Sequence, residues 1–292
     1  NALKHYAKPV ANAVGMLADK IIENKGKKIV LVSLARAGIP IGILVKRYIK
    51  FKYGINVPHY SISIIRGRGI DDNAMKYLLE KYRPQQILFV DGWIGKGAIL
   101  NELKKDISAY EGVSADIAVV ADPANVTELC GTHEDILIPS SCLNSTVSGL
   151  ISRTFLRDDI IGRDDFHGAV YYGELTDSDL SYDFIETIEK EFNMENTPDL
   201  EKRVESQGID EVINIGKNFG VDDINLIKPG IGETTRVLLR RIPWKVLIDE
   251  RYKGNPQLEH IVRLAEEKHT PVEYYPLTHY KCCGIIKKLA DA

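Results

Sequence analysis

Cysteine is scarce in this chain, and its spacing fits no common ligand pattern. The four are Cys130, Cys142, Cys282 and Cys283 in 292 residues, and no two of them form a C-x-x-C pair. The sequence therefore predicts neither a disulfide framework nor a zinc site, and we expect no metal bound by the protein alone. Long apolar runs are also missing, since none approaches the roughly 20 residues that cross a bilayer, and no signal-peptide pattern opens the chain. We expect a cytoplasmic protein with no membrane partner.

An excess of charge of one sign is missing as well. The net charge of −3 argues against wholesale electrostatic capture of nucleic acid. A hydrophobic fraction of 44% with 27% charged residues is typical of a globular protein, and the length allows one large core or two ordinary ones.

The segment from 86 to 99 carries the strongest functional signal. An apolar run leads into Asp91 and then into a loop with Gly95, Lys96 and Gly97 before a predicted helix. This pattern indicates a buried parallel strand with Asp91 at its carboxyl end, where open α/β sheets bind ligands. The glycines let backbone N–H groups and the start of the helix meet a phosphate. This arrangement suits a sugar phosphate, because the carboxylate can accept hydrogen bonds from ribose hydroxyls and the glycine turn beside it can bind the phosphate.

Two earlier segments predict loops that serve the same ligand. A strand at 28–34 is followed by a turn of small residues that carries Arg36, whose planar guanidinium suits pyrophosphate oxygens. A strand at 59–65 breaks into a polar stretch with Arg66 and Arg68, which we interpret as a flap that closes over an anion.

Three loops in this order resemble the type I phosphoribosyltransferase family, with its pyrophosphate loop, flap and acid-led ribose-phosphate loop. The runs at 33–38, 63–71, 91–93 and 95–98 are more specifically similar to the phosphoribosyltransferase-like proteins of bacterial tellurium-resistance stress gene clusters. That family carries a Pelota-type RNA-binding domain at its C-terminus and also has the name cysteine protease StiP. The resemblance covers nearly the whole chain. It implies a doubly wound parallel α/β sheet and a smaller C-terminal α/β/α sandwich.

The resemblance also implies a ligand and a set of site residues. The ligand is phosphoribosyl pyrophosphate with Mg²⁺, and a base-like acceptor of unknown identity takes the sugar phosphate. The residues given a catalytic role are Asp91, Arg36, Arg66 and Arg68, and those expected to bind the ligand are Ala35, Ala37, Gly38, Gly92, Gly95, Lys96, Gly97 and Ala98.

Two departures from the general phosphoribosyltransferase pattern bear on activity. Gly92 occupies the position at which the family pattern has a second acid. The phosphate loop also has no Ser or Thr, so the charge of Lys96 must replace the hydrogen bonds that hydroxyl groups would donate to the phosphate. A protein that senses the ligand without turning it over is therefore an alternative. A P-loop NTPase is disfavoured, because Val90 stands where its first glycine belongs and Gly97 stands where Ser or Thr holds Mg²⁺.

The segment 193–198 and the charged run after it have the composition of a linker, which divides the chain into domains at 1–205 and 206–292. In the first we expect helices at 3–22, 38–51, 73–82, 97–106, 123–130 and 177–192, strands at 28–34, 59–65, 86–91, 115–121 and 135–139, and a small-residue helix over 142–154. In the second we expect strands at 245–249 and 271–276 and helices at 256–268 and from about 282.

The segment 228–236 resembles the glycine-(x)-Asn-Glu-x-x-Lys signature of Pelota and kink-turn-binding ribosomal proteins, with Gly232 in place of Asn and Arg236 in place of Lys. A helix start accepts phosphates, and Glu233 can accept from a base amino group. We expect RNA to be a partner, bound by Gly230, Gly232, Glu233, Arg236 and Arg240. The alternative is a solvated cationic helix face.

Three functions remain open from the sequence. They are a phosphoribosyltransferase, an RNA-binding regulator that senses phosphoribosyl pyrophosphate, and a cysteine peptidase. For the peptidase, Cys142 at a predicted helix start is the best nucleophile, with His133 or His167 as its base. The two phosphate-type loops have no role in peptide hydrolysis and favour the first two readings.

Overall fold

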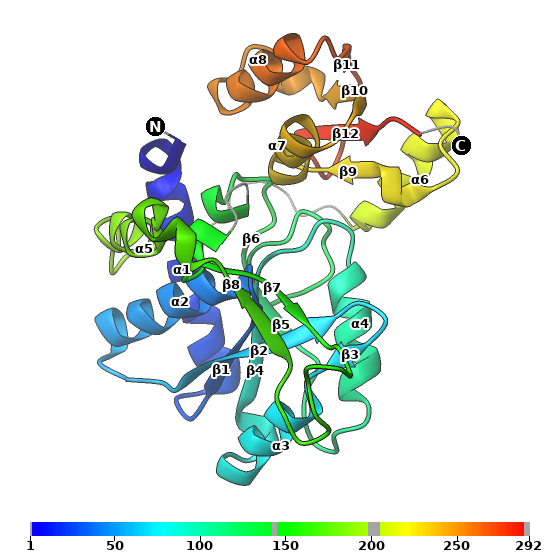
Figure 1. Ribbon diagram of the computed structural model, residues 1–292. Coiled ribbons are helices and arrows are strands. Elements are labelled where there is room, and N and C mark those ends of the chain that lie inside the picture. The colour runs from blue at the N-terminus through cyan, green and yellow to red at the C-terminus, as the bar shows by residue number, and fades with distance from the viewer. Residues whose placement is uncertain (1, 142–144, 198–204, 289–292) are drawn as a thin grey trace.

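The computed structural model describes residues 2–141, 145–197 and 205–288. Two sheets organise the chain, one of six strands in the N-terminal domain and one of four strands in a smaller C-terminal domain (Figure 1). Across these described ranges, no helix combines the length and apolar character that a bilayer crossing needs.

The six-stranded sheet is parallel except at one edge. Its strands are β1 (Val30–Ala35), β2 (His59–Ile65), β3 (Gly69–Ile70), β4 (Ile87–Trp93), β5 (Ile117–Ala121) and β6 (Cys130–Thr132). Their order is β3-β2-β1-β4-β5-β6, and only the short β3 pairs antiparallel, with β2. The predicted α/β class with a mostly parallel sheet is confirmed.

Helices cover both faces of this sheet because alternate strand residues point to opposite sides. One face, including Leu31 and Leu88, packs against helices α1 (Ala2–Lys25), α2 (Gly38–Tyr53) and α5 (Ser181–Glu189). The other, including Val32 and Phe89, packs against α3 (Asp72–Lys81) and α4 (Ala98–Ile107). Burial on both faces explains why the central strands read as continuous apolar runs.

The C-terminal domain is a mixed sheet with helices on both sides. Its strands are β9 (Ile227–Pro229), β10 (Pro243–Ile248), β11 (Val272–Tyr274) and β12 (Cys282–Ile286), in the order β11-β10-β12-β9. Helices α7 (Ile231–Arg240) and α8 (Glu259–Glu267) pack on one face, and α6 (Gly208–Phe219) packs on the other. Figure 1 shows α7, β9 and the start of α6 on the side of this domain that faces the N-terminal domain.

Several predicted elements are wrong. The predicted helix 123–130 is absent: residues 123–129 form a loop and Cys130 begins β6, because the Asp122 carboxylate accepts the N–H groups of Val126 and Thr127 and holds a turn. The segment 135–139 is not a strand, and the chain from 282 forms β12 rather than a helix. Residues 142–144 lie outside the described part, and beyond them the predicted helix gives way to a 3₁₀ turn and to β7 (Ile151–Phe155), which pairs with β8 (Gly168–Tyr171).

Candidate ligand pocket between the two domains

The pocket begins where two parallel neighbours end. Strands β1 and β4 pair in register, so the loop after β1, with Arg36, lies beside Asp91 near the end of β4. Glycine is required at position 38, because a Cβ atom there would overlap the carbonyl oxygen of Val90. The start of α2 can therefore approach β4 closely, which brings the two predicted loops to one place. The Ala35–Arg36 peptide bond in this loop is cis.

A pocket of about 220 Å³ lies at these strand ends. It is formed by the two predicted loops, by the segment after β6, and by one residue of the C-terminal domain. Its lining residues are Leu34, Ala35, Arg36, Ala37, Pro40, Ile64, Asp91, Gly92, Trp93, Ile99, Ile138, Ser140, Val147, Ser148 and Arg236. Val147 and Ser148 belong to the stretch 142–154, which the sequence predicted as a small-residue helix, and Ser140 lies just before it.

Asp91 is the acidic group of the pocket. One carboxylate oxygen accepts the N–H of Gly92 at 2.7 Å. Burial raises the pKa of Asp91 to about 7, and the hydrogen bond from Gly92 acts in the opposite direction. The carboxyl group therefore changes charge near neutral pH, which is common for groups that act in a site.

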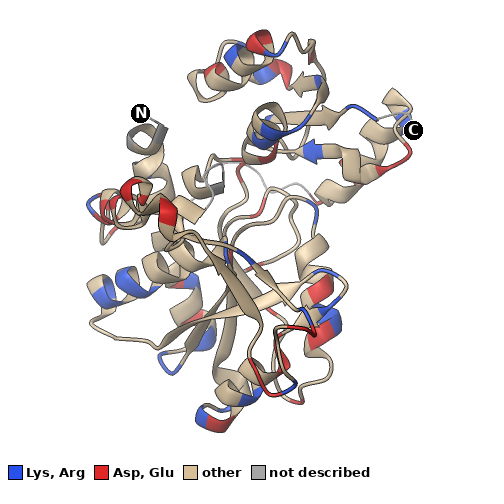
Figure 2. Cartoon of the chain, in the orientation of Figure 1, with Lys and Arg blue, Asp and Glu red and all other residues tan. Residues whose placement is uncertain are grey.

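The cationic side of the pocket is built from both domains. Burial lowers the pKa of Arg36, and repulsion from Arg236 and Arg240 lowers it further. Arg236 forms an ion pair with Glu233 at 2.6 Å and also lines the pocket. Figure 2 shows acidic and basic residues spread over both domains, with Lys and Arg on α7. The sequence predicted RNA binding for Arg236 and did not predict that it lines this pocket, because the residue pattern does not show how the two domains pack together.

Lys96, which the sequence predicts to bind a phosphate, contacts the C-terminal domain in this structure. Its ammonium group donates to the carbonyl oxygens of Ile224 and Ile227, at 2.7 Å and 3.1 Å, and so joins the two domains instead of lining the pocket. Burial, with repulsion from Lys228, lowers the pKa of Lys96 to about 8.

The other members of the predicted phosphate loop and flap also lie outside the pocket lining. Gly97, with a φ of 85°, precedes α4, whose first residue is Ala98. Arg66 and Arg68 are exposed in the β2–β3 turn, and the N–H of Gly67 between them donates to Glu102 on α4. The flap tip therefore contacts α4 rather than covering the pocket.

The predicted RNA-binding turn is buried at the domain boundary. Gly230, Ile231 and Gly232 are buried, and the N–H of Ile231 donates to both oxygens of Asp135, at 3.0 Å and 3.2 Å. A Cβ atom at Gly230 would lie 3.0 Å from the ring of Trp93. Contrary to the expectation, this turn holds a protein carboxylate and does not face solvent, whereas Arg240 is exposed.

Further hydrogen bonds join the same two domains. The hydroxyl group of Tyr280 donates to the carbonyl oxygen of Gly95 at 2.6 Å. The N–H of Lys281 donates to Asp135 at 2.9 Å, and the N–H of Gly208 donates to the carbonyl of Ala124 at 2.9 Å. The predicted loop glycine Gly95 thus serves the domain contact.

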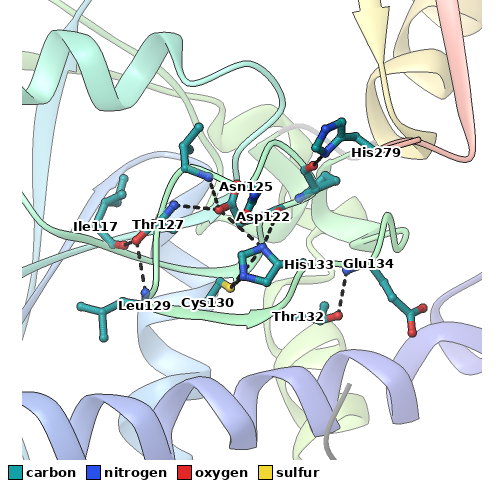
Figure 3. A network of polar contacts seen from close by, with 12 residues as sticks. Ile117, Asp122, Asn125, Thr127, Leu129, Cys130, Thr132, His133, Glu134 and His279 are labelled. Carbon is teal, nitrogen blue, oxygen red and sulfur yellow. Dashed lines mark hydrogen bonds and ion pairs between the residues drawn. The ribbon is translucent and has the colours of Figure 1, made fainter. Parts of the chain in front are cut away.

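The cysteines of the described residues are buried. Burial raises the pKa of both Cys282 and Cys283, which makes them poor nucleophiles. Cys130 lies in β6, with its sulfur 3.4 Å from Nε2 of His133 (Figure 3). Cys142, the best nucleophile by sequence, lies outside the described residues. His167 contacts Ser63 through Nδ1 at 2.9 Å.

These features define an α/β protein with a pocket at the carboxyl ends of a mostly parallel sheet, lined mainly by apolar residues together with a few charged ones, and a smaller C-terminal domain over it. The chain belongs to the family described as tellurite-like stress resistance cysteine protease StiP, whose model matches residues 1–189. Residues 206–288 match the model of the PELOTA RNA binding domain. Cysteine protease StiP of Acinetobacter baylyi (strain ATCC 33305 / BD413 / ADP1) is 32% identical over 309 residues, which cover 99% of this chain and 80% of that protein.

Solved structures with a similar fold include phosphoribosyltransferases. A hypoxanthine-guanine phosphoribosyltransferase from Bacillus anthracis is 18% identical, covers 43% of this chain and 77% of its own, and has a TM-score of 0.33. An HGPRT-ase from Leishmania tarentolae in complex with GMP is 15% identical, with coverages of 46% and 75% and a TM-score of 0.32. These similarities concern the fold alone.

Proposed function

We propose that this chain is a phosphoribosyltransferase-type enzyme that binds phosphoribosyl pyrophosphate with Mg²⁺ and transfers the sugar phosphate to a base-like acceptor. The observation that supports it is the position of Arg36 and Asp91, which line one pocket at adjacent strand ends. In this proposal Arg36 binds the leaving pyrophosphate, and ionised Asp91 stabilises the positive charge that develops on the ribose. The serines near the pocket wall, Ser140 and Ser148, offer hydrogen bonds to an acceptor.

The donor set fits a Mg²⁺ ion that arrives with its ligand. Mg²⁺ is commonly held by one or two carboxylates, substrate phosphates and water, and the pocket lining supplies the Asp91 carboxylate with glycine at 92. When bound, the ion neutralises pyrophosphate charge. Arg36 from the N-terminal domain and Arg236 from the C-terminal domain both line the pocket and add positive charge there.

Calorimetric titration of the full chain with Mg²⁺ and phosphoribosyl pyrophosphate tests the proposal. Arg36→Ala and Asp91→Asn should each weaken binding about tenfold or more, because a charge-assisted contact contributes about 1.5–3 kcal/mol. Arg157→Ala is the matched control, since Arg157 is exposed and pairs with Asp159. Unchanged affinity in both pocket variants would remove the proposal. Pyrophosphate release with a panel of bases separates an enzyme from a regulator that only senses the ligand.

RNA binding is a second proposed activity, supported by the match of residues 206–288 to the PELOTA RNA binding domain. The buried glycine turn is not its contact surface in this arrangement, whereas Arg240 and Arg241 are exposed at the end of α7. Each phosphate contact adds about one unit to the salt slope of binding. Arg241→Ala should therefore lower that slope for a structured RNA, and Arg263→Ala on α8 should not. An equal effect of both variants would indicate only diffuse attraction.

The family name makes a cysteine peptidase the competing proposal, and the contact between Cys130 and His133 favours it. A peptidase needs a thiolate that a peptide can reach, an adjacent base and an oxyanion hole. Cys130 has no exposed surface, which argues against attack on a peptide. Iodoacetamide labelling and cleavage of a protein substrate by the parent, Cys130→Ser and Cys142→Ser decide the matter. We expect the parent to show no cysteine-dependent cleavage. If the parent does cleave the substrate, and if Cys130→Ser or Cys142→Ser loses this cleavage but still binds phosphoribosyl pyrophosphate, the protein is a peptidase.

A further inference from the structure

A second cavity lies within the C-terminal domain and shares no lining residue with the pocket at the strand ends. Its volume is about 370 Å³, within the range of about 300–1,000 Å³ that is common for ligand sites. The cavity is formed by the end of α6 with the loop after it, by β10, and by the end of β12 with the residues that follow. Its aromatic and charged lining residues are Phe219, Asp222, Asp223, Trp244, Lys287 and Lys288. The proposed transfer reaction uses none of them.

The aromatic wall of this cavity has an accessible ring. Trp244 is 39% exposed, and Phe219 lines the cavity beside it. The ammonium group of Lys245 lies 4.8 Å from the centre of the Phe219 ring and 5.5 Å from a ring centre of Trp244, so one cation contacts both side chains. Lys245 pairs with Glu273 at 2.5 Å and is not itself a lining residue. Contacts within the domain therefore hold the two rings, and Trp244 remains open to a flat ligand.

Cations lie at the same cavity. Lys287 and Lys288 are exposed and directly follow β12. The backbone N–H of Lys287 donates to the carbonyl oxygen of Ile242 at 2.9 Å, which brings the lysines close to the exposed Arg241 at the end of α7. Cations at neighbouring positions suit successive phosphates of a nucleic-acid strand, and an aromatic ring suits an unpaired base. Since Arg241 lies beyond the lining, the cationic surface is longer than one nucleotide and favours a strand over a free nucleotide.

Two carboxylates balance the two lysines of the lining. Asp223 holds its own loop, because its Oδ1 accepts the N–H and the side-chain amide of Asn225, at 2.9 Å and 2.8 Å. Asp222 is exposed and lines the cavity. A carboxylate only accepts hydrogen bonds, so it suits the N4 amino group of cytosine and repels the O4 atom of uracil. The balanced charge suits one base with its phosphate better than a bare polyphosphate.

We propose that this cavity binds one unpaired nucleotide of a single-stranded RNA. The base stacks on Trp244, its amino group donates to Asp222, and the adjacent phosphates contact Lys287 and Lys288. This site rests on the RNA binding proposed above for the C-terminal domain, and it adds a preference for cytosine over uracil. The cavity belongs to one domain, so it stays available while the glycine turn is buried against the N-terminal domain.

Fluorescence anisotropy of labelled RNA octamers with the full chain tests this site. We expect tighter binding of a cytidine octamer than of a uridine octamer or of a fully paired duplex of the same length. Trp244→Ala should weaken binding of the cytidine octamer at least about fivefold, the loss expected for one stacked base, and Trp244→Phe should retain most of the affinity. Tyr274→Ala is the matched control. Tyr274 is 38% exposed in the same domain, has the ammonium group of Lys253 at 4.9 Å from its ring centre, and does not line the cavity.

Two further variants separate base recognition from phosphate contact. Asp222→Asn should remove the preference for cytidine over uridine, because an amide can donate to the O4 atom of uracil. Lys287→Ala should lower the slope of log affinity against log salt by roughly 0.7, the value for one phosphate of a single strand. Lys268→Ala, at the exposed end of α8, should leave that slope unchanged.

The outcomes distinguish this site from RNA binding in general. Equal affinity of the parent and of folded Trp244→Ala for the cytidine octamer overturns the site and leaves RNA binding in place. Equal affinity of the parent for the octamer and the duplex also overturns it, as attraction to phosphate charge alone. Displacement of the octamer by an equal concentration of cytidine monophosphate assigns the cavity to free nucleotides instead. A parent that binds neither the octamers nor a structured RNA removes the proposed RNA binding together with this site.

The test does not depend on the folding of Trp244→Ala. Asp222 is exposed, so Asp222→Asn should keep the fold, and an unchanged preference for cytidine in this variant overturns the proposed base contact. Trp244 is also one of two tryptophans in the chain, with Trp93. Addition of the cytidine octamer should change the tryptophan fluorescence of the parent, and Trp244→Phe should lose this change while it still binds.

Discussion

The carboxylate of Asp135 accepts the backbone N–H of Ile231 across the domain boundary, at 3.0 Å and 3.2 Å to its two oxygens. Ile231 is the first residue of α7, and a helix start favours an anion. Asp135 therefore occupies the position that the glycine turn was predicted to offer to an RNA phosphate. The buried Asp135 carboxylate also accepts the N–H of Lys281, so one side chain fixes two segments of the C-terminal domain.

Replacing Asp135 should loosen the domain contact. Asp135→Ala leaves the N–H groups of Ile231 and Lys281 without this acceptor, and each unsatisfied buried donor costs about 1–3 kcal/mol. Chemical denaturation should therefore show a loss of stability of about 2–4 kcal/mol. Asp158→Ala, at an exposed position, is the control.

The same variant should bind structured RNA more tightly than the parent does, because the start of α7 becomes open to a phosphate. Filter binding at several salt concentrations measures this. Weaker RNA binding by a folded Asp135→Ala protein would show that RNA is bound elsewhere in the C-terminal domain.

Arg236 should contribute to binding of the small ligand although it belongs to the C-terminal domain. It lines the same pocket as Arg36, and its loss removes one cation available to the ligand's phosphates. Arg236→Ala should lower the affinity for phosphoribosyl pyrophosphate about three- to tenfold in calorimetry, less than a full charged contact because Glu233 already pairs with Arg236. Arg241→Ala provides the comparison. Equal affinities in the two variants would place the ligand away from α7.

Lys96 should affect stability rather than direct ligand contact. Its ammonium group joins the loop before α4 to the carbonyls of Ile224 and Ile227. Lys96→Met keeps most of the apolar stem but leaves these carbonyls without the charge, and should lower stability by about 1–2 kcal/mol. Its effect on phosphoribosyl pyrophosphate affinity should stay within about twofold. A loss of affinity as large as that of Arg36→Ala, at unchanged stability, would restore the phosphate-binding role.

The sequence predicted the parts of this fold that depend on local pattern. Apolar runs gave β1, β4 and β5 within a few residues, because strands buried on both faces carry no polar interruptions. The prediction was wrong where a hydrogen bond from a single side chain determines the local backbone conformation. Asp122 turns the segment after β5 by accepting two N–H groups, and no periodicity indicates such a contact.

The site was predictable only within one domain. Arg36 and Asp91 follow neighbouring parallel strands, so their meeting could be expected from topology. The roles of Arg236 and Lys96 depend on how the C-terminal domain lies over the strand ends, and that arrangement arises from contacts such as Asp135 to Ile231. In the sequence, residues that form such a domain contact resemble residues that bind a ligand. Both kinds of contact use glycine, charged side chains and backbone groups that are available for hydrogen bonds.

Asp91 should make the free protein less stable as the pH rises. Its pKa is raised by burial from 3.8 to about 7 in the folded chain. An acid whose folded pKa lies above its unfolded pKa favours folding of the protonated form, so stability falls between about pH 4 and pH 7 and then stays low. A shift of about three units corresponds to about 4 kcal/mol as an upper value, at about 1.4 kcal/mol per unit.

Asp91→Asn removes this penalty while its side-chain oxygen can still accept the N–H of Gly92. The variant should therefore raise the melting temperature more at pH 8 than at pH 5, and Asp158→Asn should raise it at neither pH. Ligand binding should move in the opposite direction, because only ionised Asp91 can hold Mg²⁺ and ribose: the parent should bind phosphoribosyl pyrophosphate more tightly at pH 8 than at pH 6, and the variant weakly at both. Thermal melts and calorimetry at each pH measure the two effects. A variant that is less stable than the parent at pH 8 and whose affinity still follows pH would show that another group titrates in the pocket.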